Sequence, residues 1–263
     1  MTGQDNPEEE NARPILTSFR DQMKTLSRSA AVLFFFLMVP AIPLLYLPVA
    51  AIIGPVQSAN VEASHILIAL PIVSMASASV VCGSIIQQRR AKIPTAPLIG
   101  RFLAGLTIPM AVVCGAYGVA FAISSMTCPM AYTGLFLTSL GVALTGTFFF
   151  CAFSFMMGIR FGDGMLSFFL LAIAMPAVCL LIVWAVPGLA PAIGCLPVFS
   201  ADLALNILGG AGLSLDGLMS VAIEGRLGSF VAGADSVLMS AVSAALGLTC
   251  VAAGCRWAGR RDA

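Results

Sequence analysis

Few residues of this 263-residue chain belong to types that perform acid–base or nucleophilic chemistry. His65 is the only histidine, and no cluster of candidate partners surrounds it in the sequence. The chain contains neither G-x-S-x-G nor H-E-x-x-H, the spacings that present a serine nucleophile or a zinc-binding pair. No carboxylates are paired within an apolar run. We therefore expect no enzyme active site in this chain.

The eight cysteines do not form a metal-binding pattern either, because no C-x-x-C pair occurs among them. Six fall in or at the ends of apolar runs and are interpreted as small apolar side chains: Cys82, Cys114, Cys151, Cys179, Cys250 and Cys255. Cys128 and Cys195 lie between such runs. Whether these two form a disulfide stays open, since sequence spacing does not show that they approach each other.

One stretch has a distinctive composition, IIQQRRAKIPTAPLIGRFLAG at residues 85–105. Only 10% of the chain is charged, yet four of its thirteen basic residues gather here: Arg89, Arg90, Lys92 and Arg101. A cytoplasmic loop needs cations simply to orient the flanking spans, which accounts for the charge alone. A short predicted helix followed by a proline-containing corner favours a docking surface.

The elements on either side of this segment are apolar enough to cross a membrane. Hydrophobic residues make up 59% of the chain, and its mean hydropathy of +1.01 is far above that of a soluble domain. The net charge of +1 provides no general attraction to nucleic acid. Six runs reach the roughly 18 to 20 residues needed to cross a bilayer core of about 30 Å. They lie near 30–53, 64–86, 102–125, 131–157, 165–186 and 237–255.

The positions of Lys and Arg predict the orientation of these spans. With six spans, every basic residue except Arg226 falls on one side of the membrane, which we assign to the cytoplasm together with both termini. The sequence therefore predicts an all-α integral membrane protein of the plasma membrane. Its six-span domain covers residues 29–263 and follows a polar disordered tail at 1–13 and a helix at 14–28.

The helix at 14–28 is predicted to be amphipathic and to lie in the cytoplasmic interface. Five apolar residues fall within an arc of about 100° at helical spacing: Ile15, Leu16, Phe19, Met23 and Leu26. Arg20, Lys24 and Arg28 occupy the next arc. Phe19, Arg20, Met23 and Lys24 are thus the expected interfacial residues. Such a helix is either a general membrane anchor or a lever that contacts a cytoplasmic partner.

Three further features concern the packing of the predicted spans. Ser139, Ala143, Thr147 and Cys151 repeat every four residues, and such small residues let a neighbouring backbone approach closely. The stripe is interpreted as a helix-packing surface, with a dimer seam as the alternative. Pro176 is expected to kink the fifth span. The Pro- and Gly-rich stretch before the last span predicts short broken helices that re-enter the outer leaflet.

This layout resembles the permease subunit of type-2 ABC exporters (the ABC-2 family) from about residue 14 to the end. PTAPLIGRFLAG is similar to the family's proline-containing step into the third span, and CRWAGRRDA is similar to its short basic tail. Where many members carry an acidic residue at the exit of the second span, this chain has Gln87 and Gln88. The resemblance implies a coupling helix at 87–92 that docks on a separate ATP-binding subunit. Its expected docking residues are Gln87, Gln88, Arg89, Arg90 and Lys92.

The resemblance also implies that ATP binding and membrane transport belong to different subunits. The chain has no G-x-x-x-x-G-K-[ST] segment, so ATP and magnesium would be bound by the partner and no cofactor by this chain. A second permease, identical or similar, would complete the path for a hydrophobic or peptide-like substrate moving outward. Two alternatives stay open: a non-catalytic membrane scaffold that recruits another protein, and an ion-coupled transporter. The latter is disfavoured because no charged residue lies near the middle of a predicted span.

A membrane-impermeant thiol reagent tests the predicted topology. A cysteine introduced at position 91 is expected to react only after the membrane is opened, because the segment 89–92 is predicted to face the cytoplasm. A cysteine introduced at position 60, on the opposite side, serves as the control and should react in intact cells. Labelling of residue 91 from the exterior alone would contradict the six-span arrangement.

Overall fold

The structure, a computed structural model, describes residues 7–30, 33, 94–127, 133–161, 166, 169–201, 203–204, 207 and 235–260. Within these ranges the regular elements are all helices and there is no strand, so the all-α prediction is confirmed for the part of the chain described. The predicted spans at 30–53 and 64–86 lie outside these ranges, apart from residues 30 and 33.

Three helices are long and apolar enough to cross a membrane. They are α4 (Thr95–Thr127), α5 (Thr133–Phe161) and α12 (Ser236–Arg260). They correspond to the predicted spans at 102–125, 131–157 and 237–255. Helices α4 and α12 contain their predicted spans, whereas α5 begins two residues after the predicted start at 131. At 1.5 Å per residue, even the 25 residues of α12 extend over about 37 Å, more than the hydrocarbon thickness. In a medium without water, a helix satisfies its own backbone hydrogen bonds, which is why these apolar sequences adopt it.

The fifth apolar run forms an irregular helix. A π-helix, η2 (Phe169–Ala174), leads into α7 (Met175–Ala185), so that the change in helix type falls next to Pro176. Proline has no N–H and its ring clashes with the carbonyl four residues earlier, which disrupts regular α-helical bonding at this point. The outward side chains of α7 are apolar, and Leu181 and Trp184 are 65% and 75% exposed. That surface is suited to lipid rather than water.

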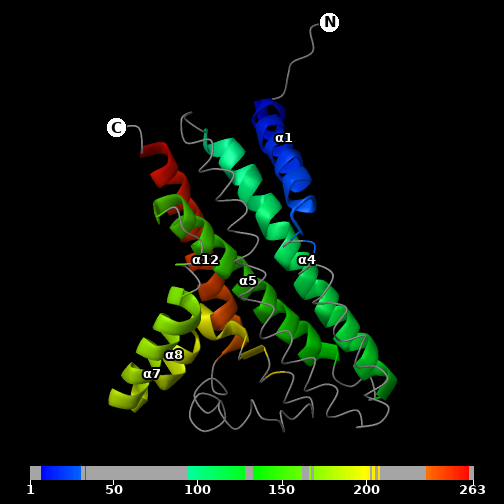
Figure 1. Ribbon diagram of the computed structural model, residues 1–263. Coiled ribbons are helices and arrows are strands. Elements are labelled where there is room, and N and C mark those ends of the chain that lie inside the picture. Colours follow the sequence, from blue (N-terminus) through cyan, green and yellow to red (C-terminus); the bar gives the residue numbers. More distant parts are fainter. Residues whose placement is uncertain are drawn as a thin grey trace, which may run out of the picture.

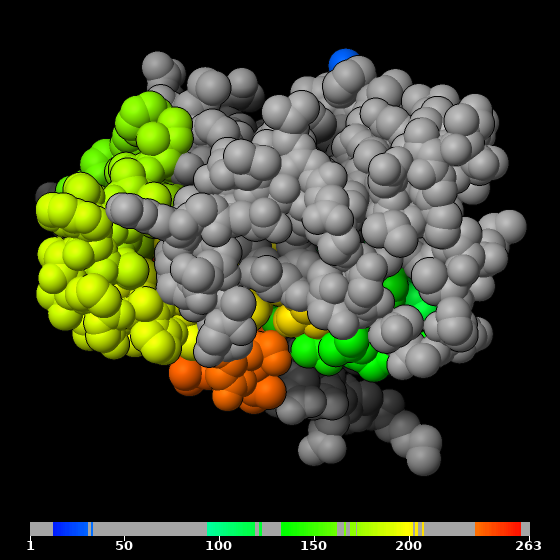
Figure 2. Space-filling view, turned by 90° about the horizontal axis from the view of Figure 1, so that it is seen from below, coloured from blue at the N-terminus to red at the C-terminus, as the bar shows by residue number. Residues whose placement is uncertain are grey.

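The chain after α7 is broken into short pieces, as the Pro- and Gly-rich sequence predicts. They are η3 (Pro187–Leu189), α8 (Ala190–Gly194) and η4 (Pro197–Phe199), followed by helical residues at 200–201 and 203–204. The residues from Pro197 to Ala201 are buried. In the view of Figure 2, α7 and α8 form one edge of the molecule.

The N-terminal helix α1 (Pro7–Ser27) begins seven residues before the predicted start at Pro14. Pro7 suits the first helical position. Pro14 therefore lies inside the helix. Residues 7–13, expected to be part of a disordered tail, are helical.

The two ends of the bundle differ in charge. Figure 1 shows α1, the first turns of α4 and the last turns of α12 at one end of the molecule, where α5 also ends. We call this the basic end, because it carries cations of α1, α4, α5 and α12: Arg13, Arg20, Lys24, Arg101, Arg160 and Arg256. At the other end Asp235 caps α12, and its Oδ1 accepts hydrogen bonds from the backbone N–H of Val237 and Leu238 at 2.8 and 3.2 Å.

Helix α5 packs most extensively on α12, and two glycines make the close approach possible. A Cβ at Gly247 would meet the ring of Phe148, with Cδ1 only 2.6 Å away. One heptad further, a Cβ at Gly254 would lie 3.2 Å from the ring of Phe155. The equal seven-residue spacing on both helices means that α5 and α12 run in the same direction.

Replacing Gly247 by Ala should destabilise the protein by about 1 to 3 kcal/mol, because the added methyl overlaps the Phe148 ring. That ring cannot withdraw freely, since it packs edge-on against Phe102 of α4 with 6.1 Å between centroids. Gly141→Ala on α5 is the matched control, because nothing lies within 4 Å of its added methyl. It should leave stability unchanged or raise it by up to about 1 kcal/mol. Unfolding in detergent measures both, and equal stabilities would contradict the packing described.

Candidate functional site

The predicted docking residues Gln87, Gln88, Arg89, Arg90 and Lys92 lie outside the described residues. The structure begins again at Pro94, and α4 starts at Thr95, three residues after Lys92. Pro97 falls in the first turn, where its missing N–H costs nothing. Helix α4 therefore begins seven residues before residue 102, the predicted start of its span. The described residues nearest in sequence to the docking segment are the first turns of α4. These turns pack on α1, and we call this contact the α1–α4 junction.

At this junction the two helices touch along their backbones. A Cβ added to Gly100 would overlap the carbonyl oxygen of Ile15 and would lie 3.1 Å from the Cβ of Ser18. Beside this contact, Leu26, Leu98 and Phe102 are buried in one apolar cluster that also includes residues of α5 and α12. Helix α1 is thus fixed to α4, the helix that follows the predicted docking segment in the chain.

The predicted interfacial residues divide between the two sides of α1. Phe19 and Met23 are half-buried and pack on the apolar cluster, while Arg20 and Lys24 are exposed. Because the apolar side contacts α4, the protein itself covers part of the surface that was predicted to lie in lipid. The Lys24 ammonium lies 3.9 Å from Asp21, with both side chains well exposed, a geometry that contributes little stability.

Arg101 belongs to helix α4 rather than to the loop before it. Its side chain is half-buried and interacts electrostatically with Asp21 of α1. The fourth cation of the basic segment thus contributes to the α1–α4 junction. The sequence did not indicate this role, because the partner carboxylate lies eighty residues earlier in the chain.

The small-residue stripe of α5 is buried within the chain. Ser139, Ala143 and Thr147 have no exposed surface and Cys151 is 3% exposed. Thr147 Oγ1 donates a hydrogen bond of 2.8 Å to the carbonyl of Ala143 in its own helix. On the same helix, a Cβ at Gly146 would overlap the Ser200 hydroxyl. The broken segment after α7 is therefore packed against this part of α5, and the stripe serves contacts within one chain.

A buried hydrogen-bond chain joins three elements at the Ser139 end of the stripe. The Ser139 hydroxyl donates to the carbonyl oxygen of Ala204 at 2.7 Å, and Tyr117 of α4 lies 2.8 Å from Ser139 Oγ. Since Ser139 has one proton to donate, the Tyr117 hydroxyl is the donor in the second bond. Tyr117 was not among the residues predicted from the sequence. A tyrosine inside an apolar span was the available signal, because its hydroxyl needs a partner there.

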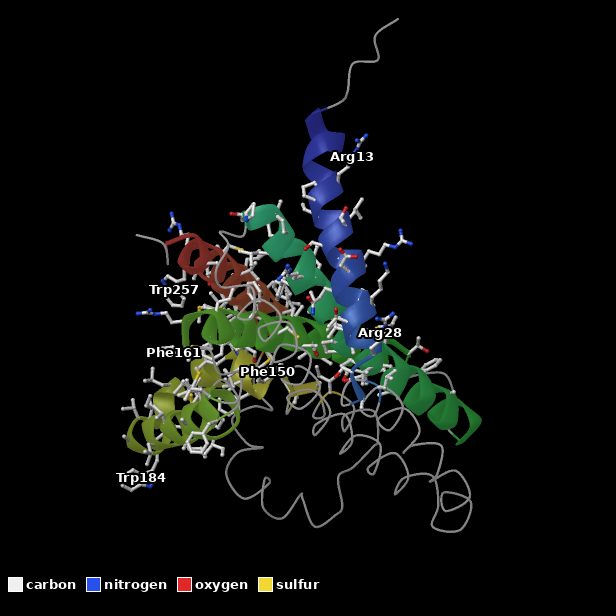
Figure 3. All side chains as sticks on the ribbon, turned by 45° about the horizontal axis from the view of Figure 1, so that its top comes forward. Arg13, Arg28, Phe150, Phe161, Trp184 and Trp257 are labelled. Carbon is white, nitrogen blue, oxygen red and sulfur yellow. The ribbon has the colours of Figure 1, made fainter. Side chains whose placement is uncertain are left out.

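The ends of α5 and α12 are joined by aromatic and cationic side chains. The Arg160 guanidinium carbon lies 5.6 Å from the centroid of the Trp257 ring and 5.9 Å from that of Phe161. Figure 3 shows Trp257 and Phe161 near the basic end and Trp184 away from it on α7. These distances are in the range of a cation–π interaction.

The described residues contain no group of three or more histidine, cysteine or acidic side chains that could hold a metal ion. His65 and Cys128 lie outside the described part of the chain. Cys195 is buried with its thiol free. The buried polar groups around α5 are hydroxyls and backbone carbonyls, which suit helix packing and positioning better than acid–base chemistry. No protein-family model matches the chain, and no curated protein matches it in sequence.

The Tyr117–Ser139–Ala204 hydrogen bonds predict unequal effects of two substitutions. Tyr117→Phe removes one donor and leaves Ser139 bonded to Ala204, so it should cost about 0.6 kcal/mol of stability and at most about 1.7. Ser139→Ala leaves both the tyrosine hydroxyl and the Ala204 carbonyl without this partner, and should cost about 1 to 3 kcal/mol.

The neighbouring Thr138→Ala is the control, because its exposed hydroxyl bonds only to Gly134 of its own helix. It should change stability by less than about 0.5 kcal/mol. Detergent unfolding of the three variants gives the order, and a Ser139 variant as stable as the Thr138 variant would contradict the hydrogen-bond chain.

Proposed function

We propose that this chain is the membrane-spanning permease of an ATP-driven exporter that moves a hydrophobic or peptide-like substrate outward. A separate ABC ATP-binding subunit would supply the energy, and a second permease would complete the transport path. The chain would lie in the plasma membrane with six spans and both termini in the cytoplasm. Its own residues would bind no nucleotide, in line with the lack of a P-loop in the sequence.

The main support for the proposal is that the basic segment at 87–92 leads directly into α4, a helix that is packed against α1, α5 and α12. Residues 87–92 lead within a few residues into α4. Gly100 of that helix contacts the backbone of α1, and Phe102 belongs to a cluster with residues of α5 and α12. A displacement applied to the segment by a closing ATPase dimer would therefore reach the bundle through packed contacts rather than through a flexible loop.

The charge distribution supports the proposed orientation. The cations of α1, α4, α5 and α12 gather at the basic end, while Asp235 caps α12 at the other end. A cytoplasmic basic end follows the rule that Lys and Arg are retained inside. The short pieces after α7 would be the re-entrant helices of the outer leaflet. Their burial against α5 supplies the protein shielding that irregular backbone needs at such depth.

A membrane scaffold is the alternative from another class, and the same basic segment would then recruit a different protein. The two functions differ in whether ATP hydrolysis by a bound subunit responds to this chain. An ion-coupled carrier would instead transport without ATP and stop when the ion gradient collapses. The described spans offer hydroxyl and carbonyl groups but no carboxylate at their centres for such an ion.

Charge reversal at the docking segment tests the exporter. The variant Arg89→Glu, Arg90→Glu, Lys92→Glu should retain at most about a tenth of the ATPase that co-purifies with the wild-type chain, because like charges would replace the attraction. Stimulation of ATP hydrolysis should fall in parallel. The control reverses three other cations at the same predicted side: Arg256, Arg260 and Arg261.

The control variant should still co-purify with the wild-type amount of ATPase. Thiol labelling should verify that neither variant has changed its topology. Undiminished co-purification and stimulation in the docking variant would contradict the docking assignment. Binding of a protein that does not hydrolyse ATP, with no response of any ABC ATPase, would favour the scaffold.

A further inference from the structure

The last turns of α5 and α12 carry an arginine between two aromatic rings. We define the Arg160 group as Arg160, Phe161 and Trp257. The Arg160 guanidinium carbon lies 5.6 Å from the ring centroid of Trp257 and 5.9 Å from that of Phe161. Arg160 is exposed, Phe161 is 57% exposed and Trp257 is half-buried, so the group forms part of the surface. Figure 3 labels Phe161 and Trp257 at the neighbouring ends of the two helices.

The two helices place this group at one level along their axes. Helices α5 and α12 run in the same direction, and Gly254 of α12 lies against the ring of Phe155 of α5. Arg160 follows Phe155 by five residues, and Trp257 follows Gly254 by three. At 1.5 Å per residue, the two positions differ by only about 3 Å along the bundle. The members of the group therefore meet the surroundings at the same depth.

The distribution of charge along α12 identifies that depth. No charged residue lies between Asp235, which caps the helix, and Arg256 in its last turns. The rise from one to the other is about 32 Å, close to the thickness of a bilayer core of about 30 Å. Helix α5 likewise has no charged residue before Arg160. Because charge is costly in hydrocarbon, the core of the bilayer ends at Arg256 and Arg160.

The chemistry of the group suits the boundary between lipid headgroups and acyl chains. A tryptophan ring has an apolar body and a polar N–H, and is enriched at this boundary for that reason. Trp257 packs partly on the apolar cluster of α4, α5 and α12, so one side of the ring is fixed by the protein. In water, the exposed ring of Phe161 would lose the free energy of apolar burial. Beside acyl chains the ring is buried, while the Arg160 guanidinium reaches the polar layer.

We propose that the Arg160 group is the surface by which α5 and α12 contact the headgroup–acyl boundary of the lipid leaflet at the basic end. Arg160 is a positioning residue in this contact, because its guanidinium holds the Trp257 ring at the boundary through the cation–π interaction. The inference rests on membrane insertion alone. It does not depend on transport or on a partner ATPase, so its failure would leave the proposed function untouched.

Tryptophan fluorescence in lipid vesicles tests the depth of the group. The chain has only two tryptophans, so Trp184→Phe leaves Trp257 as the single reporter. Trp184 is 75% exposed on α7, and its replacement leaves the core intact. The full-length variant is reconstituted into phosphatidylcholine brominated either near the headgroup or near the end of the acyl chain. Bromine near the headgroup should quench Trp257 at least about twice as strongly, because the ring lies at the boundary.

Two further substitutions in the same background separate the cation–π interaction from charge alone. Arg160→Gln should lower the ratio of shallow to deep quenching, because the Trp257 ring is no longer held by the guanidinium. Arg256→Gln is the matched control, since it removes a neighbouring charge and leaves the contact between Arg160 and Trp257 in place. It should keep the ratio of the parent protein. An unchanged ratio in the Arg160 variant, or an equal fall in the control, would overturn the role given to Arg160.

Three results with the parent protein would overturn the placement itself. Stronger quenching by the deep bromines would place Trp257 inside the hydrocarbon. Quenching by acrylamide in the aqueous phase but by neither brominated lipid would place the basic end beyond the membrane. Quenching by none of the three would mean that a protein surface, and not lipid, covers the Arg160 group.

Discussion

Close approach of helix backbones to α5 is the constraint on which the rest of the structure depends. Lipid is as apolar as leucine, so helices in a membrane gain little from apolar burial and depend on tight packing. Gly146 admits Ser200, and Gly247 and Gly254 of α12 receive the rings of Phe148 and Phe155. Helix α5 consequently contacts α4, α12 and the broken segment through its small residues and its phenylalanine rings. A larger side chain at one of these glycines would push the two packed elements apart.

The second organising feature is the separation of charge between the ends of the bundle. Ionisable groups are costly in hydrocarbon, so the cations occupy helix ends and the outward side of α1. Arg101 is the informative exception, because it stands in the second turn of α4, is half-buried and interacts electrostatically with Asp21 of another helix. At the basic end, Arg101 thus contributes to the α1–α4 junction, while Arg20, Lys24 and Arg256 are exposed.

The sequence predicted the long helices well and the side-chain partners poorly. Apolar length alone located α4, α5 and α12, because an uncharged run of that size must form a helix in lipid. The start of α1 was placed at Pro14, since proline favours a first turn, but Pro7 fits the same rule. The role of Tyr117 was missed because its partner Ser139 was considered only as a small residue. Hydrogen bonding and small size are both properties of serine, and the sequence alone does not say which one a position uses.

By itself, the sequence determined that this is a helical chain with apolar spans and with its cations collected in a few segments. These properties follow from solvation, which depends on residue type and hardly on neighbours. Only the tertiary structure decided that α1 packs its apolar side on α4, that Arg101 interacts electrostatically with Asp21, and that the broken segment after α7 packs against this part of α5. Those choices depend on shape complementarity between residues far apart in the chain, and no local pattern of amino acids encodes it.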